Sequence, residues 1–448
     1  MTDLTTVTAT ELSSLYQSGA ASPVTVAHQV LAKIAQINPI LNAFCFTDPE
    51  TTLAQAHASE QRWRQGQPLS AMDGVPVAIK DSILTQGWPT LHASLTVDPN
   101  QHWNKDAPAI ARLREAGAVF AGKTTMSEFG GKITTDSLLY GITRNPWNIK
   151  CSPGGSSGGS AVAVASGLTP IALGTDYSGS VRIPAAFCGV VGFKPTHEVI
   201  DKNVNSLFNC GCVGQLARSV DDVMLMMGIN ADSLDMSKIR IAYSPNFGFA
   251  KSINYEVEKS IAHVAQTLSL AGAKVTEIDR LCDDPTNILG SIYAIDTTIR
   301  WNQFDNYQKQ AIGITGMPDI KLTDCFVLED LIKKTKIQQY ILQQQLKAFA
   351  TSYDIILSPS TAVTADTFLA HDTESDQTYG SAAIKYIPFS YLFNITGQPA
   401  VSVPVGVNHL GMPIGVQLAG AIGADVLVLQ LAQIIEKHFP MPPCPVIL

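Results

Sequence analysis

The spacing of hydrophobic residues changes along the chain from a helical period to short apolar runs. In the first 60 residues the period is helical, and Thr8 with Glu11 forms a capping box at the start of one helix. Ser22-Pro23 marks the start of a second helix, since serine caps helices and proline suits their first position. We expect that helix to end at Asn38-Pro39.

From Gly74 onward, apolar runs of strand length alternate with helical segments. Such alternation favours an α/β fold with a mostly parallel or mixed sheet that helices cover. Helices are predicted at 107–116, 160–166, 256–270 and 426–438, and residues 280–350 are helical and polar. Strands are predicted at 75–79, 118–121, 170–173, 238–243, 274–278, 354–357, 400–404 and 414–418.

Composition narrows the class of protein. The 448 residues are 46% hydrophobic and 15% charged, which is ample for a large core. The net charge of −8 has no long runs, so neither nucleic acid nor a membrane is an expected partner. No signal peptide or membrane span is evident, and the cysteines are scattered. We therefore expect a cytoplasmic protein with free thiols, and Cys210-Gly-Cys212 is only a weak metal motif.

A glycine- and serine-rich stretch at 151–196 contains the candidate chemistry. It holds two serine clusters, Ser156–Ser157 and Ser178–Ser180, joined by a run of small residues. Side chains this small cannot build a core, so the backbone itself is the expected working surface. Lys80 ends the apolar run 75–79 upstream. Serines, exposed backbone amides and one lysine placed to be buried are the groups that acyl transfer without histidine requires.

A lysine can activate a serine only when its amine is neutral. The ordinary lysine pKa is about 10.4, and burial lowers it. Lys80 at the end of a buried strand fits this role, although it could instead emerge into water or pair with Asp81. The turn at 175–180 can direct several N–H groups at one point as an oxyanion site, or it can simply cap the helix that begins near Pro184.

Two other motif matches are weaker. Residues 117–124 match the phosphate-loop pattern, but here a helix precedes the motif and a strand lies within it, so we assign Gly117 to a helix C-cap. Residues 155–159 match the nucleophile elbow of α/β-hydrolases, but a loop and not a strand precedes them. An elbow would also need a later histidine, and His371 and His409 are the candidates.

The same stretch resembles the signature of the amidase signature family. The resemblance begins with GGSSGGS at 154–160 and continues with GTDYSGSVRIPAAFCGVVGFKPT at 174–196. It extends over nearly the whole chain, through residues 74–81, 116–125, 141–147, 393–400 and 411–417. It implies one large α/β/α domain over 1–448, with a mixed twisted sheet at its core. Within it we expect an N-terminal helical region (1–60), a catalytic core (61–230) and the remaining sheet and helical layer (231–448).

The resemblance also implies roles for the two serine clusters and the lysine. Lys80 matches the family's base, Ser156 its bridging serine on a cis peptide after Gly155, and Ser180 its nucleophile. A proton would pass from Ser180 to Ser156 and on to Lys80, and Ser180 would attack an amide carbonyl. Neither a cofactor nor a metal is implied.

The family's oxyanion donors map to backbone N–H groups of Tyr177, Ser178, Gly179 and Ser180. Ser178 stands where the family usually has glycine, so a positive φ there would strain it, and its hydroxyl is within reach of a substrate. Asp176 and Arg182 match charged family positions. They either orient the turn or form a buried structural ion pair.

The predicted function is hydrolysis of a small-molecule amide to a carboxylate and ammonia or an amine, by a monomer or homodimer. Residues in the family's substrate-contacting regions suggest an apolar or aromatic acyl group; they are Met126, Ser127, Tyr140, Tyr177 and the segment 389–395. The alternative is the glutaminase (A-type) component of an amidotransferase, which would have a partner protein. A non-catalytic binding protein is a third interpretation, against which intact Lys80, Ser156 and Ser180 speak.

Overall fold

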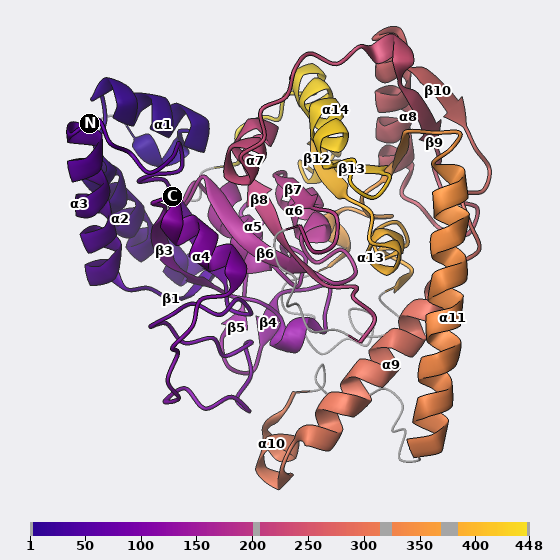
Figure 1. Cartoon of the computed structure of the whole chain (residues 1–448), viewed down its shortest axis with the longest axis horizontal. Helices are drawn as coiled ribbons and strands as arrows, with labels where there is room; N and C mark the ends of the chain where they lie inside the picture. The colour runs from indigo at the N-terminus through magenta and orange to yellow at the C-terminus, as the bar shows by residue number, and fades with distance from the viewer. Residues whose placement is uncertain (1–2, 200–206, 314–324, 369–383, 446–448) are drawn as a thin grey trace.

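One mixed sheet of eleven strands forms the centre of the molecule, and helices lie on both of its faces (Figure 1). A computed structural model describes residues 3–199, 207–313, 325–368 and 384–445. The strand order is β1-β3-β2-β6-β8-β7-β12-β13-β11-β9-β10. The predicted α/β class with a helix-covered mixed sheet is confirmed.

The strands are short and come from both halves of the chain. They are β1 (Phe44–Phe46), β2 (Pro76–Lys80), β3 (Val119–Thr124), β6 (Ile171–Asp176), β7 (Val191–Lys194), β8 (Cys212–Ala217), β9 (Arg240–Tyr243), β10 (Lys274–Glu277), β11 (Ile355–Pro359), β12 (Ala400–Val407) and β13 (Pro413–Gly420). A separate small hairpin joins β4 (Asp136–Ser137) to β5 (Gly141–Ile142).

Alternate residues of each central strand face opposite layers of helices, as the pleat requires. In β2, Val77 and Ile79 pack into one core and Ala78 into the other. Larger side chains such as Ile171 and Leu173 of β6 face the first core, which four helices cover. These helices are α4 (Pro108–Glu115), α7 (Val220–Met227), α8 (Tyr255–Leu270) and α14 (Asp425–His438).

The opposite face is covered by two groups of helices. Near β2 and β6 lie α1 (Ala9–Ser18), α2 (Pro23–Leu41), α5 (Gly158–Ala165) and α6 (Arg182–Cys188). Near β11–β13 lie α9 (Thr286–Gln303), α11 (Cys325–Phe349) and α13 (Leu392–Thr396). The remaining α-helices in the described ranges are α3 (Pro49–Arg64), which packs on α2, and α10 (Asn306–Ala311).

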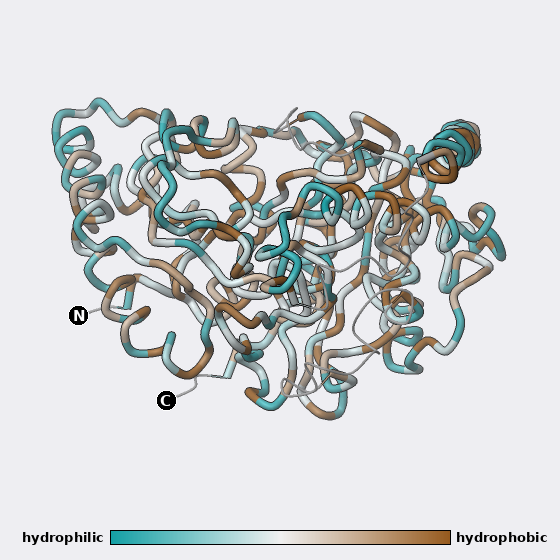
Figure 2. Tube along the Cα trace, turned by 90° about the horizontal axis from the view of Figure 1, so that it is seen from below, coloured by the Kyte–Doolittle hydropathy of each residue, from teal (hydrophilic) through white to brown (hydrophobic). Residues whose placement is uncertain are grey.

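The outer helices alternate hydrophilic and hydrophobic residues along their turns (Figure 2). This pattern is expected of helices that pack one side against a sheet and expose the other to water. No helix in the described part of the chain is long and apolar enough to cross a bilayer.

The local predictions near the N-terminus hold with one exception. The Thr8–Glu11 capping box and the Ser22 cap are both formed. However, α2 does not stop at Asn38-Pro39 but continues to Leu41, and Asn42 ends it in the left-handed conformation. A proline removes only one helical hydrogen bond, and Asn38 Oδ1 accepts the N–H groups of the residues that leave the helix.

The strand pairing brings the candidate chemistry to one edge of the sheet. β2 and β6 are parallel neighbours, with Ile79 opposite Leu173. Their carboxyl ends therefore meet, and Lys80 is the last residue of β2 while Asp176 is the last of β6. The phosphate-loop match is excluded by the same region, because Gly117 follows α4 with a φ of +85° and β3 follows it.

Candidate active site

The Lys80 amine is fully buried and surrounded by neutral oxygen atoms. Its Nζ lies 2.8 Å from both Ser156 Oγ and Ser157 Oγ, and 2.9 Å from Thr175 Oγ1. Among the described residues it forms no ion pair. The Asp81 carboxylate instead accepts the N–H groups of Leu91 and Ala93. Neither the exposed position nor the Asp81 pairing that the sequence left open is found.

This environment lowers the pKa of Lys80 to about 7, because burial disfavours the ammonium more than the nearby Asp176 charge favours it. A lysine with that pKa is substantially neutral near neutral pH. A neutral amine has a lone pair, which can accept a proton from a neighbouring hydroxyl. The geometry therefore suits a base that receives a proton from serine.

Ser156 and Ser157 reach Lys80 from the start of α5. The peptide bond between Gly155 and Ser156 is cis, as the family resemblance implies. A Cβ at Gly155 would lie 2.5 Å from Thr134 O, so only glycine fits there. Ser157 also donates its N–H to Ser180 O at 3.1 Å and its hydroxyl to Thr175 O at 3.2 Å. It thus links the lysine to the turn that carries Ser180.

Ser156 and Ser180 both line one cavity of about 280 Å³. Ser180 is 7% exposed, so the cavity is its main access to solvent or ligand. Within the described residues, the hydrogen bond from Lys80 to Ser156 is formed, and none joins the Ser156 and Ser180 hydroxyls. The cavity places the two hydroxyls on a shared wall, with Lys80 behind Ser156.

Asp176 stabilises the turn between β6 and α6 by hydrogen bonds to its backbone. Its carboxylate accepts the Gly179 N–H at 2.8 Å and the Val181 N–H at 3.1 Å. The Gly179 N–H therefore already has an acceptor, and its predicted role as an oxyanion donor would compete with this bond. The N–H groups of Ser178 and Ser180 donate to no other described residue and remain suitable donors.

The positive φ of this turn falls on Gly179, at +116°, and Ser178 has no such φ. A Cβ at Gly179 would lie 2.3 Å from Ser390 Oγ, so glycine is required there for space as well as for conformation. The strain considered for Ser178 is absent. The substitution of serine for the usual glycine is compatible with this backbone.

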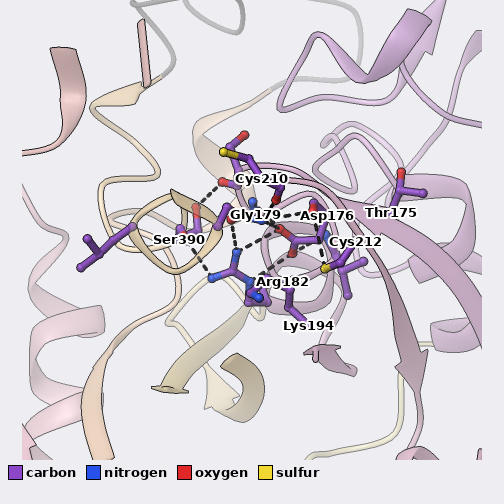
Figure 3. Close-up of polar contacts among 12 residues, drawn as sticks. Thr175, Asp176, Gly179, Arg182, Lys194, Cys210, Cys212 and Ser390 are labelled. Atoms are coloured by element: carbon purple, nitrogen blue, oxygen red, sulfur yellow. Dashed lines mark hydrogen bonds and ion pairs between the residues drawn. The ribbon is translucent and has the colours of Figure 1, made fainter. Parts of the chain in front are cut away.

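Asp176 and Arg182 form a fully buried ion pair with nitrogen–oxygen distances of 2.9 and 3.0 Å (Figure 3). Arg182 also donates to Ser390 O, Gln417 Oε1 and Asn394 Oδ1. Burial raises the pKa of the Asp176 carboxyl, but the Arg182 charge and hydrogen bonds more than offset this and hold the pKa well below its usual range. The pair is structural, and through Asp176 it also orients the turn.

Helix α9 supplies a wall of the cavity that the sequence did not predict. Tyr293 OH lies 2.6 Å from Ser178 Oγ, and Tyr177 OH donates to the Asp296 carboxylate. The Tyr177 and Tyr293 rings are 5.8 Å apart. The sequence indicated only a polar helical region here, although the cavity-lining positions share one helical face; they are Leu289, Tyr293, Asp296, Thr297 and Arg300.

The residues predicted to bind substrate separate into two groups. Met126 and Tyr177 line the cavity. Ser127 and Tyr140 do not, because Ser127 Oγ donates to Lys132 O and Tyr140 OH donates to the Asp81 carboxylate. The segment 389–395 lies behind the cavity wall in the buried core, whereas Ile387 just before it lines the cavity.

The competing histidine and metal interpretations find no support in the described residues. His409 forms an exposed pair with Glu256, and His371 lies outside the described residues. Cys210 and Cys212 are buried free thiols (Figure 3). No group of three or more His, Cys, Asp or Glu side chains suited to a metal occurs in the part of the chain that the structure describes.

Comparison with known proteins finds the same family over most of the chain. The family model described as Amidase matches residues 25–429. An acylamidase from Rhodococcus erythropolis is 31% identical, covering 97% of this chain and 96% of the relative. The A-type component of the glutamyl-tRNA(Gln) amidotransferase of Neisseria gonorrhoeae (strain ATCC 700825 / FA 1090) is 30% identical, covering 97% of this chain and 98% of that relative.

The same family appears in the structural comparison. The crystal structure of a bacterial aryl acylamidase has a TM-score of 0.85 and 26% identity to this chain, covering 97% of this chain and 96% of that one. That protein belongs to the amidase signature enzymes. Since the family model and these relatives extend over most of the chain, this protein belongs to the amidase signature family.

Proposed function

We propose that this protein is an amidase that cleaves the C–N bond of a small-molecule amide through an acyl-enzyme on Ser180. The observation that carries the proposal is the buried Lys80 amine, 2.8 Å from Ser156 Oγ, behind a cavity that Ser180 also lines. The lowered pKa of Lys80, about 7, supports its use as the base.

In the proposed reaction, neutral Lys80 takes the proton of Ser156 as Ser156 takes that of Ser180. Ser180 Oγ attacks the amide carbonyl, and the N–H groups of Ser178 and Ser180 stabilise the resulting oxyanion. The proton returns through Ser156 to the departing nitrogen as the C–N bond breaks. Water then cleaves the ester on Ser180 and releases a carboxylate, with its proton passing along the same route.

This relay requires the Ser156 and Ser180 hydroxyls to come within hydrogen-bonding distance. Each side chain turns about one bond between staggered rotamers. Ser180 Oγ accepts or donates no hydrogen bond with another described residue, so no bond within that part of the chain opposes its rotation. Binding of an amide in the cavity would supply the remaining constraint.

The experiment is a screen of aliphatic, aromatic, peptide and ureido amides, together with glutamine, with wild type and Ser180→Ala. We expect Ser180→Ala to lower kcat by about 10⁴-fold or more without unfolding the protein. Ser166→Ala is a matched control, because Ser166 Oγ donates to Val162 O on α5 and does not line the cavity. Full turnover by Ser180→Ala would contradict the assignment of Ser180 as the nucleophile.

The glutaminase component of an amidotransferase is the second candidate, and the 30% identity to the Neisseria relative supports it. Such a protein should hydrolyse glutamine weakly alone and copurify with a partner. The proposed amidase should instead turn over a simple amide without any partner. Glutamine hydrolysis that appears only after a partner protein is added would favour the second candidate.

A further inference from the structure

Arg300 is a charged residue on the cavity wall with no role in the proton relay. It lies on α9, on the same face as Tyr293 and Asp296. Its guanidinium is 4.7 Å from the centre of the Phe129 ring, and that ring stacks on His92 at 5.9 Å. Stacking on an aromatic face holds a guanidinium plane while leaving its N–H groups at the edge available.

The N–H groups of Arg300 are unused within the described residues, where it forms neither a hydrogen bond nor an ion pair. The acids near it are engaged elsewhere. Asp296 accepts the Tyr177 hydroxyl, while Glu128 accepts Ser94 Oγ at 2.7 Å and the Gly313 N–H at 2.8 Å. Lys132, the other cation of the wall, is paired with Asp136 at 2.7 Å.

Burial lowers the pKa of Arg300, and the charges of Asp296, Tyr177 and Glu128 oppose this. An arginine nevertheless remains charged at any pH where the protein is folded. A partly buried cation whose N–H groups find no acceptor among the described residues has lost hydrogen bonds to water that ring stacking does not replace, which costs free energy. A ligand carboxylate would offset this free-energy cost, because its two oxygen atoms can accept two parallel hydrogen bonds from the guanidinium.

The wall between Ser180 and Arg300 is largely apolar. Tyr293, which contacts Ser178, and Arg300 are seven positions apart on α9, or about 10 Å along the helix axis at 1.5 Å per residue. Apolar side chains complete the lining; they are Met126, Phe129, Ile133, Ile183, Leu289, Ile384 and Ile387. A ligand that reaches both ends of this space needs an apolar spacer.

We propose that Arg300 binds a carboxylate of the substrate, so that this protein acts on amides in which an apolar spacer separates the scissile carbonyl from a negative charge. The inference rests on the proposed amidase function and names its substrate class. Arg300 would determine specificity and would take no part in bond cleavage.

The test compares charged and neutral amides of equal length. One arm uses monoamides of linear dicarboxylic acids against unbranched fatty amides; the other uses N-acyl derivatives of linear ω-amino acids against N-acyl alkylamines. We expect wild type to favour the carboxylate in at least one arm, with kcat/KM about 10- to 100-fold higher, as a charge-assisted hydrogen bond supplies. Arg300→Gln should abolish that preference through KM and leave neutral amides unchanged, and Arg300→Lys should retain part of it.

Arg64→Gln is the matched control, since the Arg64 side chain is 72% exposed and lies outside the cavity lining. Equal losses for charged and neutral amides in Arg300→Gln would mean a structural role and would overturn the inference. So would a wild type with no preference in either arm. If neutral amides are still cleaved in a Ser180-dependent way, the amidase function stands without this inference.

A binding measurement keeps the inference testable without turnover. Calorimetry with Ser180→Ala and the dicarboxylic monoamides should detect binding that is lost in Ser180→Ala/Arg300→Gln. Binding that is equal in both variants contradicts the inference. Arg300-dependent binding by a wild-type protein that cleaves no amide would support the anion site and count against the proposed reaction.

Discussion

Lys80 and Arg182, two of the buried cations near Asp176, have opposite surroundings. Lys80 and Arg182 are both fully buried. Arg182 faces a carboxylate and three oxygen atoms from α13, the segment before it and β13, whereas Lys80 faces hydroxyls and one backbone carbonyl. Burial therefore lowers the pKa of Lys80 to about 7, while the Arg182 charge holds the pKa of Asp176 well below its usual range.

The difference shows that burial alone does not determine what a buried charge does. A paired charge orders its surroundings, and here it positions the turn that carries Ser180. An unpaired amine among hydroxyls becomes neutral near physiological pH and can move protons. The surroundings of Arg182 therefore stabilise its positive charge, whereas those of Lys80 favour the neutral amine.

Removing the titrating cation should have the largest effect. Lys80→Met should lower kcat/KM by about 10³-fold, since general acid–base catalysis contributes that order of rate. Stability should not fall, because the substitution removes a desolvated amine that has no ion pair. Steady-state kinetics with thermal unfolding checks both. A stable but fully active Lys80→Met would assign the proton transfer to another group.

Removing the paired cation should mainly affect stability. Arg182→Met leaves the Asp176 carboxylate buried and unpaired, so the free energy of unfolding should fall by about 3–5 kcal/mol. Urea unfolding measures this, with Arg64→Met as the exposed control. A loss no larger than that of the control would show that Asn394 and the turn's N–H groups are enough to hold Asp176.

The pH profile tests the comparison without a mutation. Lys80 is protonated below its pKa of about 7 and neutral above it, so kcat/KM for a neutral amide should rise with pH and level off above about 7. Below that point the rate should fall about tenfold per pH unit. A rate that peaks in acid is incompatible with a neutral lysine base.

Removing the hydrogen bond between Tyr293 on α9 and Ser178 should have a smaller effect than removing either cation. Tyr293→Phe removes the hydroxyl that lies 2.6 Å from Ser178 Oγ, so kcat should fall about fivefold at unchanged KM, as one hydrogen bond is worth about 1 kcal/mol. In a Ser178→Gly background the same change should have little further effect. Additive losses in the double variant would show that the two hydroxyls act independently.

A chelator should have the smallest effect. The proposed relay uses only Lys80, Ser156 and Ser180, so overnight treatment with EDTA should leave kcat unchanged. The control is the same treatment followed by addition of Zn²⁺ or Mg²⁺. Activity that disappears with EDTA and returns with one ion would place a metal in the reaction.

The sequence predicted the parts of the site whose signal is local. A lysine at the end of an apolar run and serines among glycines indicate their chemistry by immediate neighbours, and family resemblance ranked Ser156 and Ser180. The contacts of Ser157 and Thr175 with Lys80 were not predicted, because they depend on how α5 packs beneath β6. β7 and β8 were missed too, although β8 pairs with β6 at the centre of the sheet.

The α9 wall escaped prediction for a different reason. Tyr293 and Asp296 meet Ser178 and Tyr177 across more than a hundred residues of chain, so no local pattern links them. Likewise, Ser127 and Tyr140 lie close in sequence to cavity residues, but neither lines the cavity: the Ser127 hydroxyl donates to the Lys132 carbonyl and the Tyr140 hydroxyl to the Asp81 carboxylate. Side-chain direction, and not sequence position, decides membership of a site.

All the cavity-lining residues of α9 lie on one face of the helix, and this has a consequence for how related enzymes can diverge. Tyr293 and Asp296 are bonded to the turn that carries Ser180, so exchange at these positions would disturb the chemistry. Leu289, Thr297 and Arg300 lie on the same face of α9, and no hydrogen bond within the described residues joins their side chains to Lys80, Ser156 or Ser180. If the proposed reaction holds, exchange at these three positions of a single helix should change substrate preference and leave the proton relay in place.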